Sequence, residues 1–109
     1  MGPLSTLVMS GLAFDKAFIT GSHFTLSRGF STPELREAST KQAALKMARY
    51  KVVLMDSDKF GMDSMVIIAP PDGVDMLITD WHIKPEVVRQ FESLGVEVAA
   101  AKQETDAGE

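Results

Sequence analysis

Short apolar runs recur along the chain and are separated by polar segments that contain glycine or proline. The runs are rich in β-branched and aromatic residues and short for helices, so they predict β-strands. The predicted strands are residues 14–22, 51–55, 64–69, 74–79 and 96–100. The sequence PPDG, which follows the third strand, predicts a turn because proline fixes φ and glycine permits positive φ.

The segment between the first two predicted strands favours a loop followed by a long helix. Residues 23–31 are expected to form the loop, with a turn at Gly29. Ser31 or Thr32 would cap the helix, because a proline follows them and proline suits the first helical position. The helix should run to about Tyr50. The residues expected to pack on a sheet are Leu35, Ala38, Leu45 and Ala48.

Shorter helices are predicted over residues 3–12 and 84–94, and Gly95 should end the second one. Strands that alternate with helices predict an α/β fold with a Rossmann-like, mainly parallel sheet and flanking helices. The length of 109 residues fits one domain. We expect this domain to span residues 2–101 and residues 102–109 to form a disordered tail.

Composition and charge argue against several classes of function. The chain is 45% hydrophobic and 24% charged, which is typical of a soluble globular protein. Its net charge of −4 gives no general attraction to phosphate backbones, so we expect no direct DNA contact. The absence of cysteine and the separation of His23 from His82 predict no disulfide and no metal site. Without a long apolar window or a secretory signal, we expect a cytoplasmic protein with no membrane partner.

Polar residues follow two of the predicted strands directly. Asp56, Ser57 and Lys59 come after the strand 51–55, and Asp80 comes after the fourth strand. Ligands of open α/β sheets bind outside the carboxyl ends of the strands, so these residues are candidates for ligand binding. Both aspartates could instead cap backbone amides, and the lysine could be a surface residue in a turn. No glycine-rich phosphate motif follows a strand, so we expect no nucleotide cofactor.

Four motifs occur in one order, namely residues 15–21 (DKAFITG), Glu37-Ala38 with Lys41, residues 56–61 (DSDKFG) and residues 78–80 (ITD). Together they resemble the C-terminal effector-sensing domain of DeoR-family bacterial transcriptional repressors, over residues 2–101. The resemblance implies a non-enzymatic sensor of a phosphorylated sugar, with a fold similar to ribose-5-phosphate isomerase. The family's DNA-binding helices and the earlier half of its sensor domain have no counterpart in this sequence. We therefore expect only the later part of such a sensor domain.

The resemblance also implies roles for individual residues. Lys59 is expected near the phosphate of the effector, because a lysine can contact a phosphate as a point charge. Lys41 matches a lysine of the family's helix and would point toward the pocket, or it would be solvated on that helix. Gly21 and Ser22 match a loop whose backbone amides approach the ligand. Asp56 is expected to accept hydrogen bonds from sugar hydroxyls.

Two positions depart from the family pattern. Phe24 replaces a glycine, and Asp58 replaces a serine or threonine, so its charge would repel a phosphate held by the neighbouring lysine. One alternative function is therefore an oligomerisation remnant without ligand binding. A second alternative, a sugar-phosphate isomerase-like enzyme, lacks the carboxylate pair that the reaction needs. A partial sheet exposes an edge and an apolar face, so we expect a homo-oligomer.

Overall fold

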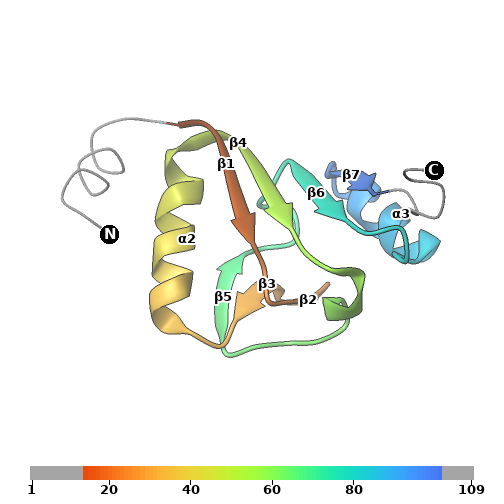
Figure 1. The fold of residues 1–109 in the computed structure, drawn as a ribbon, viewed down its shortest axis with the longest axis horizontal. Helices are drawn as coiled ribbons and strands as arrows, with labels where there is room; N and C mark the ends of the chain where they lie inside the picture. The colour runs from red at the N-terminus through yellow and green to blue at the C-terminus, as the bar shows by residue number, and fades with distance from the viewer. Residues whose placement is uncertain (1–13, 102–109) are drawn as a thin grey trace, which may run out of the picture.

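Two β-sheets and two α-helices make up residues 14–101, the part of the chain that the computed structural model describes (Figure 1). Sheet A contains β1 (Phe14–Thr20), β4 (Ala48–Leu54), β6 (Met76–Thr79) and β7 (Glu97–Ala100). Sheet B contains β2 (His23–Thr25), β3 (Gly29–Thr32) and β5 (Val66–Ala69). The helices are α2 (Leu35–Met47) and α3 (Pro85–Ser93), and a short 3₁₀ turn, η1, spans Ser57–Lys59. The predicted helix over 3–12 and the predicted tail over 102–109 lie outside the described residues.

Sheet A confirms the predicted parallel sheet. Its strand order is β1-β4-β6-β7, and every neighbouring pair is parallel. Because each successive strand is added on the same side, right-handed crossovers place all the connecting elements on one face of the sheet. The hydrophobic core agrees with this, since Ile19, Val53 and Leu77 of sheet A pack with Phe30 of sheet B and Phe91 of α3.

An aromatic cluster fixes sheet B to α3. The ring centroid of Phe24 lies 4.7 Å from that of Phe30, 4.8 Å from that of Phe91 and 5.7 Å from that of Phe60. Aromatic pairs at these separations stabilise a fold beyond the area that they bury. Phe24, one of the two departures from the family pattern, is therefore a core residue of this chain, with 3% of its surface exposed.

The expected loop over residues 23–31 is wrong. β2 and β3 form an antiparallel hairpin, and β5 pairs with β3 in sheet B rather than joining the parallel sheet. The backbone of Gly29 has a φ of 91°, a conformation that glycine adopts readily. Its missing side chain also matters, because a Cβ there would lie 2.3 Å from the carbonyl oxygen of Ala69. The predicted turn is present at residues 26–28, and Gly29 directly follows it as the first residue of β3, which packs tightly on β5.

The long helix is shorter at both ends than the sequence predicted. Ser31 and Thr32, the expected caps, are fully buried residues of β3, and α2 begins after Glu34. Thr32 still accepts a hydrogen bond from the Glu34 amide, at 3.4 Å. The helix ends at Met47 because the next seven residues pair with β1 as β4. The expected packing face is partly wrong as well, since Leu35 is 69% exposed.

The second helix follows the prediction closely. α3 spans Pro85–Ser93, with the proline in its first turn, and buries Phe91 against the core. Gly95 lies just beyond it with a φ of 84°, which fits a glycine that terminates a helix. α3 connects β6 to β7, which pair in parallel. Its amino-terminal end therefore follows the carboxyl end of β6.

Candidate functional site

Two strand-end loops meet at the carboxyl edge of sheet A. The turn η1 follows β4, and Asp80 follows the neighbouring β6. The Asp80 carboxylate accepts hydrogen bonds from the Ser57 amide at 2.9 Å, the Ser57 hydroxyl at 2.6 Å and the His82 amide at 3.0 Å. The hydroxyl of Ser57, followed by its amide, holds the pKa of the Asp80 carboxyl below its usual value. Asp80 therefore ties the two loops together, as in the capping role that the sequence left open.

A second polar cluster lies at the carboxyl end of β1. The amine of Lys41 donates hydrogen bonds to the carbonyl oxygen and the hydroxyl of Thr20 and lies 3.5 Å from the carboxylate of Glu37. Glu37 accepts a hydrogen bond from the Thr32 hydroxyl at 2.9 Å, which, with the charge of Lys41, lowers the pKa of that carboxyl. The Ser22 hydroxyl lies 3.4 Å from the hydroxyl of Thr32. Lys41 thus points toward the end of β1, rather than into solvent.

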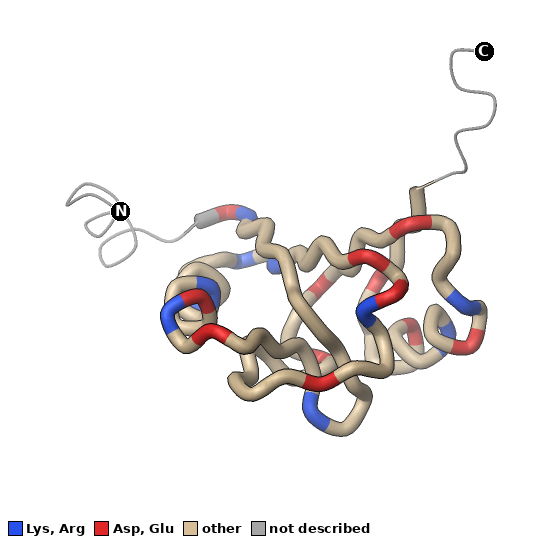
Figure 2. The backbone as a smooth tube through the Cα atoms, turned by 60° about the horizontal axis from the view of Figure 1, so that its bottom comes forward, with Lys and Arg blue, Asp and Glu red and all other residues tan. Residues whose placement is uncertain are grey.

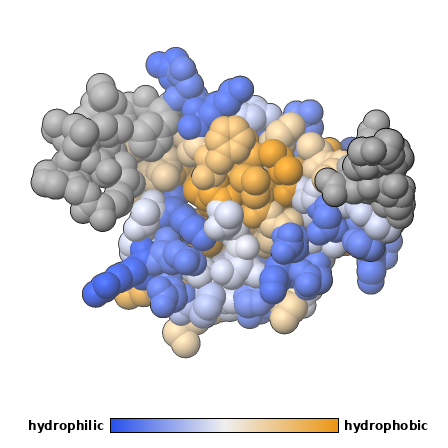
Figure 3. Space-filling view, in the orientation of Figure 1, coloured by the Kyte–Doolittle hydropathy of each residue, from blue (hydrophilic) through white to orange (hydrophobic). Residues whose placement is uncertain are grey.

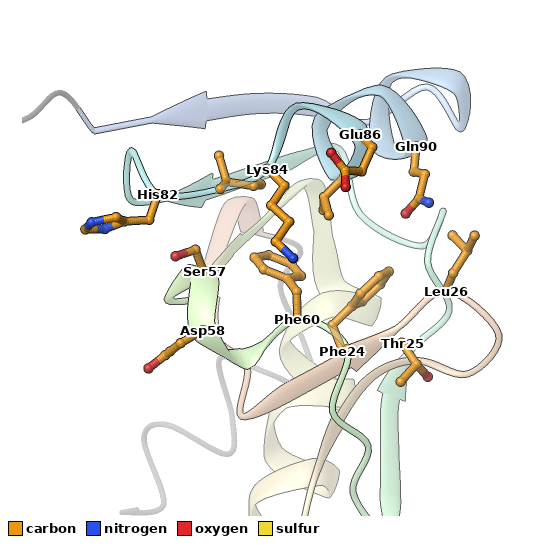
Figure 4. A pocket seen from close by; sticks show the side chains of 13 residues that line it. Phe24, Thr25, Leu26, Ser57, Asp58, Phe60, His82, Lys84, Glu86 and Gln90 are labelled. Atoms are coloured by element: carbon orange, nitrogen blue, oxygen red, sulfur yellow. The ribbon is translucent and has the colours of Figure 1, made fainter.

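A cavity of about 540 Å³ lies between β2, η1 and the amino-terminal end of α3 (Figure 4). Its apolar walls come from Phe24, Phe60, Ile83 and Val87, among others. Its polar lining comes from Thr25, Ser57, Asp58, His82, Lys84, Glu86 and Gln90. Figure 4 shows the Lys84 side chain reaching toward Phe60, whereas the Asp58 carboxylate points away from that ring. The cavity therefore combines an aromatic base with a small number of polar groups, as ligand sites commonly do.

The structure brings some of the predicted site residues together and leaves others apart. Ser57 lines the cavity. Asp80 does not line it, but its carboxylate fixes Ser57 by accepting hydrogen bonds from the Ser57 amide and hydroxyl. Lys59 is half-buried, and its side chain makes no hydrogen bond or ion pair with other residues of the described range. Asp56 is exposed and its side chain does not cap η1, so the local capping alternative for this residue is wrong. Neither Lys59 nor Asp56 lines the cavity.

Gly21 has a structural reason to be small. Its amide donates a hydrogen bond to the carbonyl oxygen of Leu54 at 3.2 Å, so this amide extends the sheet. A Cβ at this position would lie 3.1 Å from the sulfur of Met55 and 3.6 Å from a methyl group of Val53. The glycine lets β1 and β4 stay close where the two strands end, and the following residue, Ser22, turns the chain toward sheet B.

Sequence reasoning missed the residues that α3 and its preceding loop contribute. Lys84, Glu86 and Gln90 line the cavity. The sequence of their segment predicted only a helix that ends before Gly95. The available signal was the strand-end rule itself, because the residues that follow Asp80 also leave the carboxyl end of a parallel strand. Thr25 was missed for another reason, since its segment was interpreted as a loop.

Charge and donor groups limit the chemistry of the described residues. Figure 2 shows acidic and basic residues interspersed along residues 14–101, without a continuous basic stripe. In that range no three histidine, cysteine, aspartate or glutamate side chains come together as metal ligands. His23 hydrogen-bonds through its Nδ1 to the Ser64 hydroxyl, and Arg28 pairs with Asp63 at 2.7 Å, so these groups tie the loop before β5 to the hairpin. None of the described helices has the length and apolar character of a membrane span.

Comparison with known proteins identifies what this chain is similar to. Residues 1–81 match the family described as the DeoR C terminal sensor domain. The HTH-type transcriptional regulator GolR of Listeria innocua is 27% identical over 101 residues, which cover 93% of this chain and 40% of that protein. The HTH-type transcriptional regulator UlaR of Escherichia coli is 32% identical over 81 residues, covering 74% and 32%.

A third relative is also an HTH-type transcriptional regulator that this chain matches over part of its length. The uncharacterized HTH-type transcriptional regulator FruR of Bacillus subtilis is 35% identical over 80 residues, which cover 73% of this chain and 32% of that protein. The chain therefore spans about a third to two fifths of the length of the relatives that it matches.

Proposed function

The chain belongs to the DeoR C-terminal sensor domain family, and from this membership we propose that it is the effector-sensing module of a DeoR-type transcriptional regulator. The effector is a phosphorylated sugar or a related anionic metabolite, and its binding controls DNA contacts made elsewhere. The names of the relatives support the regulatory part of this proposal, since they are HTH-type transcriptional regulators. The module acts without catalysis, in the cytoplasm, and has no membrane partner.

The observation that carries the proposal is Lys59, a half-buried residue beside the joined loops at the strand ends, whose amine has no partner among the described residues. Two charged groups near these ends are already engaged: Lys41 with Thr20, and Asp80 with Ser57. Lys59 has no such partner among the described residues, so its amine is available to an anion. A lysine in this position can bind a phosphate as a point charge.

The remaining predicted residues fill supporting roles in the proposal. Ser57, held by Asp80, presents a fixed hydroxyl on the cavity wall. Asp56 is exposed and free to accept hydrogen bonds from sugar hydroxyls. Gly21 and Ser22 lie at the adjacent end of β1, where Lys41 orders the backbone through Thr20.

Sensing requires that the effector bind two states of the regulator with different affinity. An effector that contacts residues of both η1 and the β1 end would fix the relative position of two loops that leave different strands. The DNA-binding region and, in a homo-oligomer, the neighbouring copy would respond to that change. This is the physical content of the proposed regulation.

An assembly role without ligand binding is the second candidate, and one observation favours it. Asp58 is exposed next to Lys59, so its charge offsets the attraction that the lysine offers to a phosphate. A binding experiment on the chain separates the two candidates.

The experiment is a thermal-shift screen of the chain against sugar phosphates, the corresponding free sugars and inorganic phosphate. A ligand present at 100 times its Kd stabilises the folded state by about 2.7 kcal/mol. We expect a sugar phosphate to raise the Tm, and we expect Lys59→Ala to abolish this rise. Lys46→Ala, a change in the last turn of α2, should leave the rise intact. The absence of a shift with all the sugar phosphates, in a sample that melts cooperatively, would contradict sensing and favour the assembly role.

A further inference from the structure

The cavity between β2, η1 and the amino-terminal end of α3 is separate from most of the residues predicted for the effector. Among those residues only Ser57 lines it, and the Ser57 hydroxyl already donates a hydrogen bond to Asp80. No residue of β4 or β6 lines it, so it also differs from the apolar area over these strands in Figure 3. Its volume of about 540 Å³ lies in the range of small-molecule sites. The cavity therefore has room for a ligand of its own.

Phe60 gives the cavity a fixed aromatic floor. Its half-buried ring lies edge-on to the rings of Phe24 and Phe91, at centroid separations of 5.7 Å and 5.9 Å. The backbone beside it is held as well, because the Gly61 amide donates a 2.8 Å hydrogen bond to the carbonyl oxygen of Phe24. A side chain that is already held in place loses little conformational entropy when a ligand packs on it. The floor is therefore preorganised for an apolar ligand surface.

Three polar side chains from the α3 segment surround this floor and keep free hydrogen-bonding capacity. Lys84, Glu86 and Gln90 are exposed, and within residues 14–101 their side chains form no hydrogen bond or ion pair with another residue. Glu86 and Gln90 are four residues apart and so lie on the same face of the helix. Figure 4 shows the Lys84 amine reaching toward Phe60 and the Gln90 amide extending from α3 into the cavity. The rim thus offers both donors and acceptors.

The charges of the lining favour an uncharged ligand. Lys84 stands against two carboxylates, those of Asp58 and Glu86, so the lining has no excess of positive charge for a phosphate. A cationic ligand would meet the Lys84 amine, which already reaches toward the ring on which an ammonium would stack. His82, the remaining titratable residue of the lining, points away from the aromatic rings in Figure 4. A neutral molecule with many hydrogen-bonding groups fits this lining best.

We propose that the cavity binds the ring of a neutral, unphosphorylated sugar as a second ligand of this chain. The C–H face of a sugar ring is apolar and packs on Phe60, and each hydroxyl at the edge of the ring both donates and accepts hydrogen bonds. Glu86 accepts from these hydroxyls, Lys84 donates to them and Gln90 does both. This site goes beyond the proposed sensing of an anionic effector and does not depend on it, because Lys59 takes no part.

The test is saturation-transfer difference NMR on the full chain with D-glucose, D-galactose, D-ribose and myo-inositol, followed by a map of amide chemical shifts. We expect at least one of these probes to bind, with the strongest transfer at its ring C–H protons. The shifted amides should lie within residues 24–26 and 86–90. Effector binding at the strand ends is detected at residues 20–22 and 56–59 instead, so each of the two proposals can fail without the other.

Variants of α3 locate the ligand. Gln90→Ala and Glu86→Ala should each raise the Kd of the bound probe about three- to tenfold, as expected for the loss of one hydrogen bond. Glu92→Ala, at an α3 position that does not line the cavity, is the matched control and should leave the Kd unchanged. All three variants should retain the circular dichroism spectrum of the original chain.

Two results would overturn the proposed site outright: no binding by any of the four probes, or binding that both Gln90→Ala and Glu86→Ala leave unchanged. A third result would overturn its separation from the effector site. In that case a sugar phosphate would bind more tightly than the free sugar, and Gln90→Ala and Lys59→Ala would each abolish its binding.

Discussion

Replacement of Phe24 by alanine tests the most unexpected feature of the fold, a bulky core residue in the segment that the sequence assigned to a loop. Phe24 is almost fully buried and packs against Phe30, Phe91 and Phe60. Truncation of a buried phenylalanine to alanine costs about 3–5 kcal/mol, because the removed ring leaves a cavity as well as lost burial. A domain of this size has a free energy of unfolding of roughly 5–15 kcal/mol. The variant should therefore be near the limit of folding.

The assay is urea denaturation followed by circular dichroism, supported by thermal melting. The expected loss corresponds to a fall in Tm of at least about 12 °C, since each kcal/mol shifts a domain of this size by roughly 4–8 °C. The Tm of Phe24→Leu should lie between that of the original chain and that of Phe24→Ala, because leucine retains part of the buried volume. Leu35→Ala, at an exposed position of α2, is the control and should change the free energy of unfolding by less than about 0.5 kcal/mol. A loss below about 1 kcal/mol for Phe24→Ala would refute the assignment of Phe24 to the core.

Two further predictions concern the glycines and the strand-end carboxylate. Gly61→Ala should cost about 1–2 kcal/mol, because a φ of 88° is unfavourable for alanine but its Cβ meets no atom within 4 Å. Gly29→Ala has the same φ cost and also a clash with the carbonyl oxygen of Ala69, so urea denaturation should show a clearly larger loss; equal losses would contradict the tight packing on β5. Asp80→Asn should lower the Tm at pH 7 because it weakens the bonds from Ser57. The folded-state pKa of Asp80 is lowered, so its stabilisation is present at neutral pH and is lost as the pH falls through that pKa. The Tm values of the original chain and of Asp80→Asn should converge below about pH 4. A Tm difference that persists in acid would argue against this role of Asp80.

Local sequence signals were sufficient where an element depends on its own residues. α3 has a proline in its first turn and a glycine just after its end, and its bounds were predicted almost to the residue. β4 and β6 were predicted from their apolar runs, and their parallel pairing followed from the alternation with helices. These elements also place Ser57 beside Asp80, at the carboxyl ends of two neighbouring strands.

The remaining elements depend on residues that are distant in sequence. β3 is a strand because β5 pairs with it and α2 covers it, and its own sequence, GFST, resembles a loop followed by a helix cap. The start of β4 was assigned to the preceding helix because Ala48 continues the helical spacing of Leu35, Ala38 and Leu45, but pairing with β1 is decisive. The strand-end rule could have made Lys84 a candidate, but its position against β2 and η1 depends on the fold.

The most direct test of effector sensing at the strand ends is a map of amide chemical shifts, obtained by NMR as a sugar phosphate is titrated into the chain. The account predicts that the perturbed amides cluster at residues 20–22, 56–60 and 80–84, and that Lys59→Ala removes the response without altering the rest of the spectrum. Perturbations confined to other regions, or a spectrum unchanged by every sugar phosphate tested, would contradict the assignment of this chain as a ligand-binding sensor.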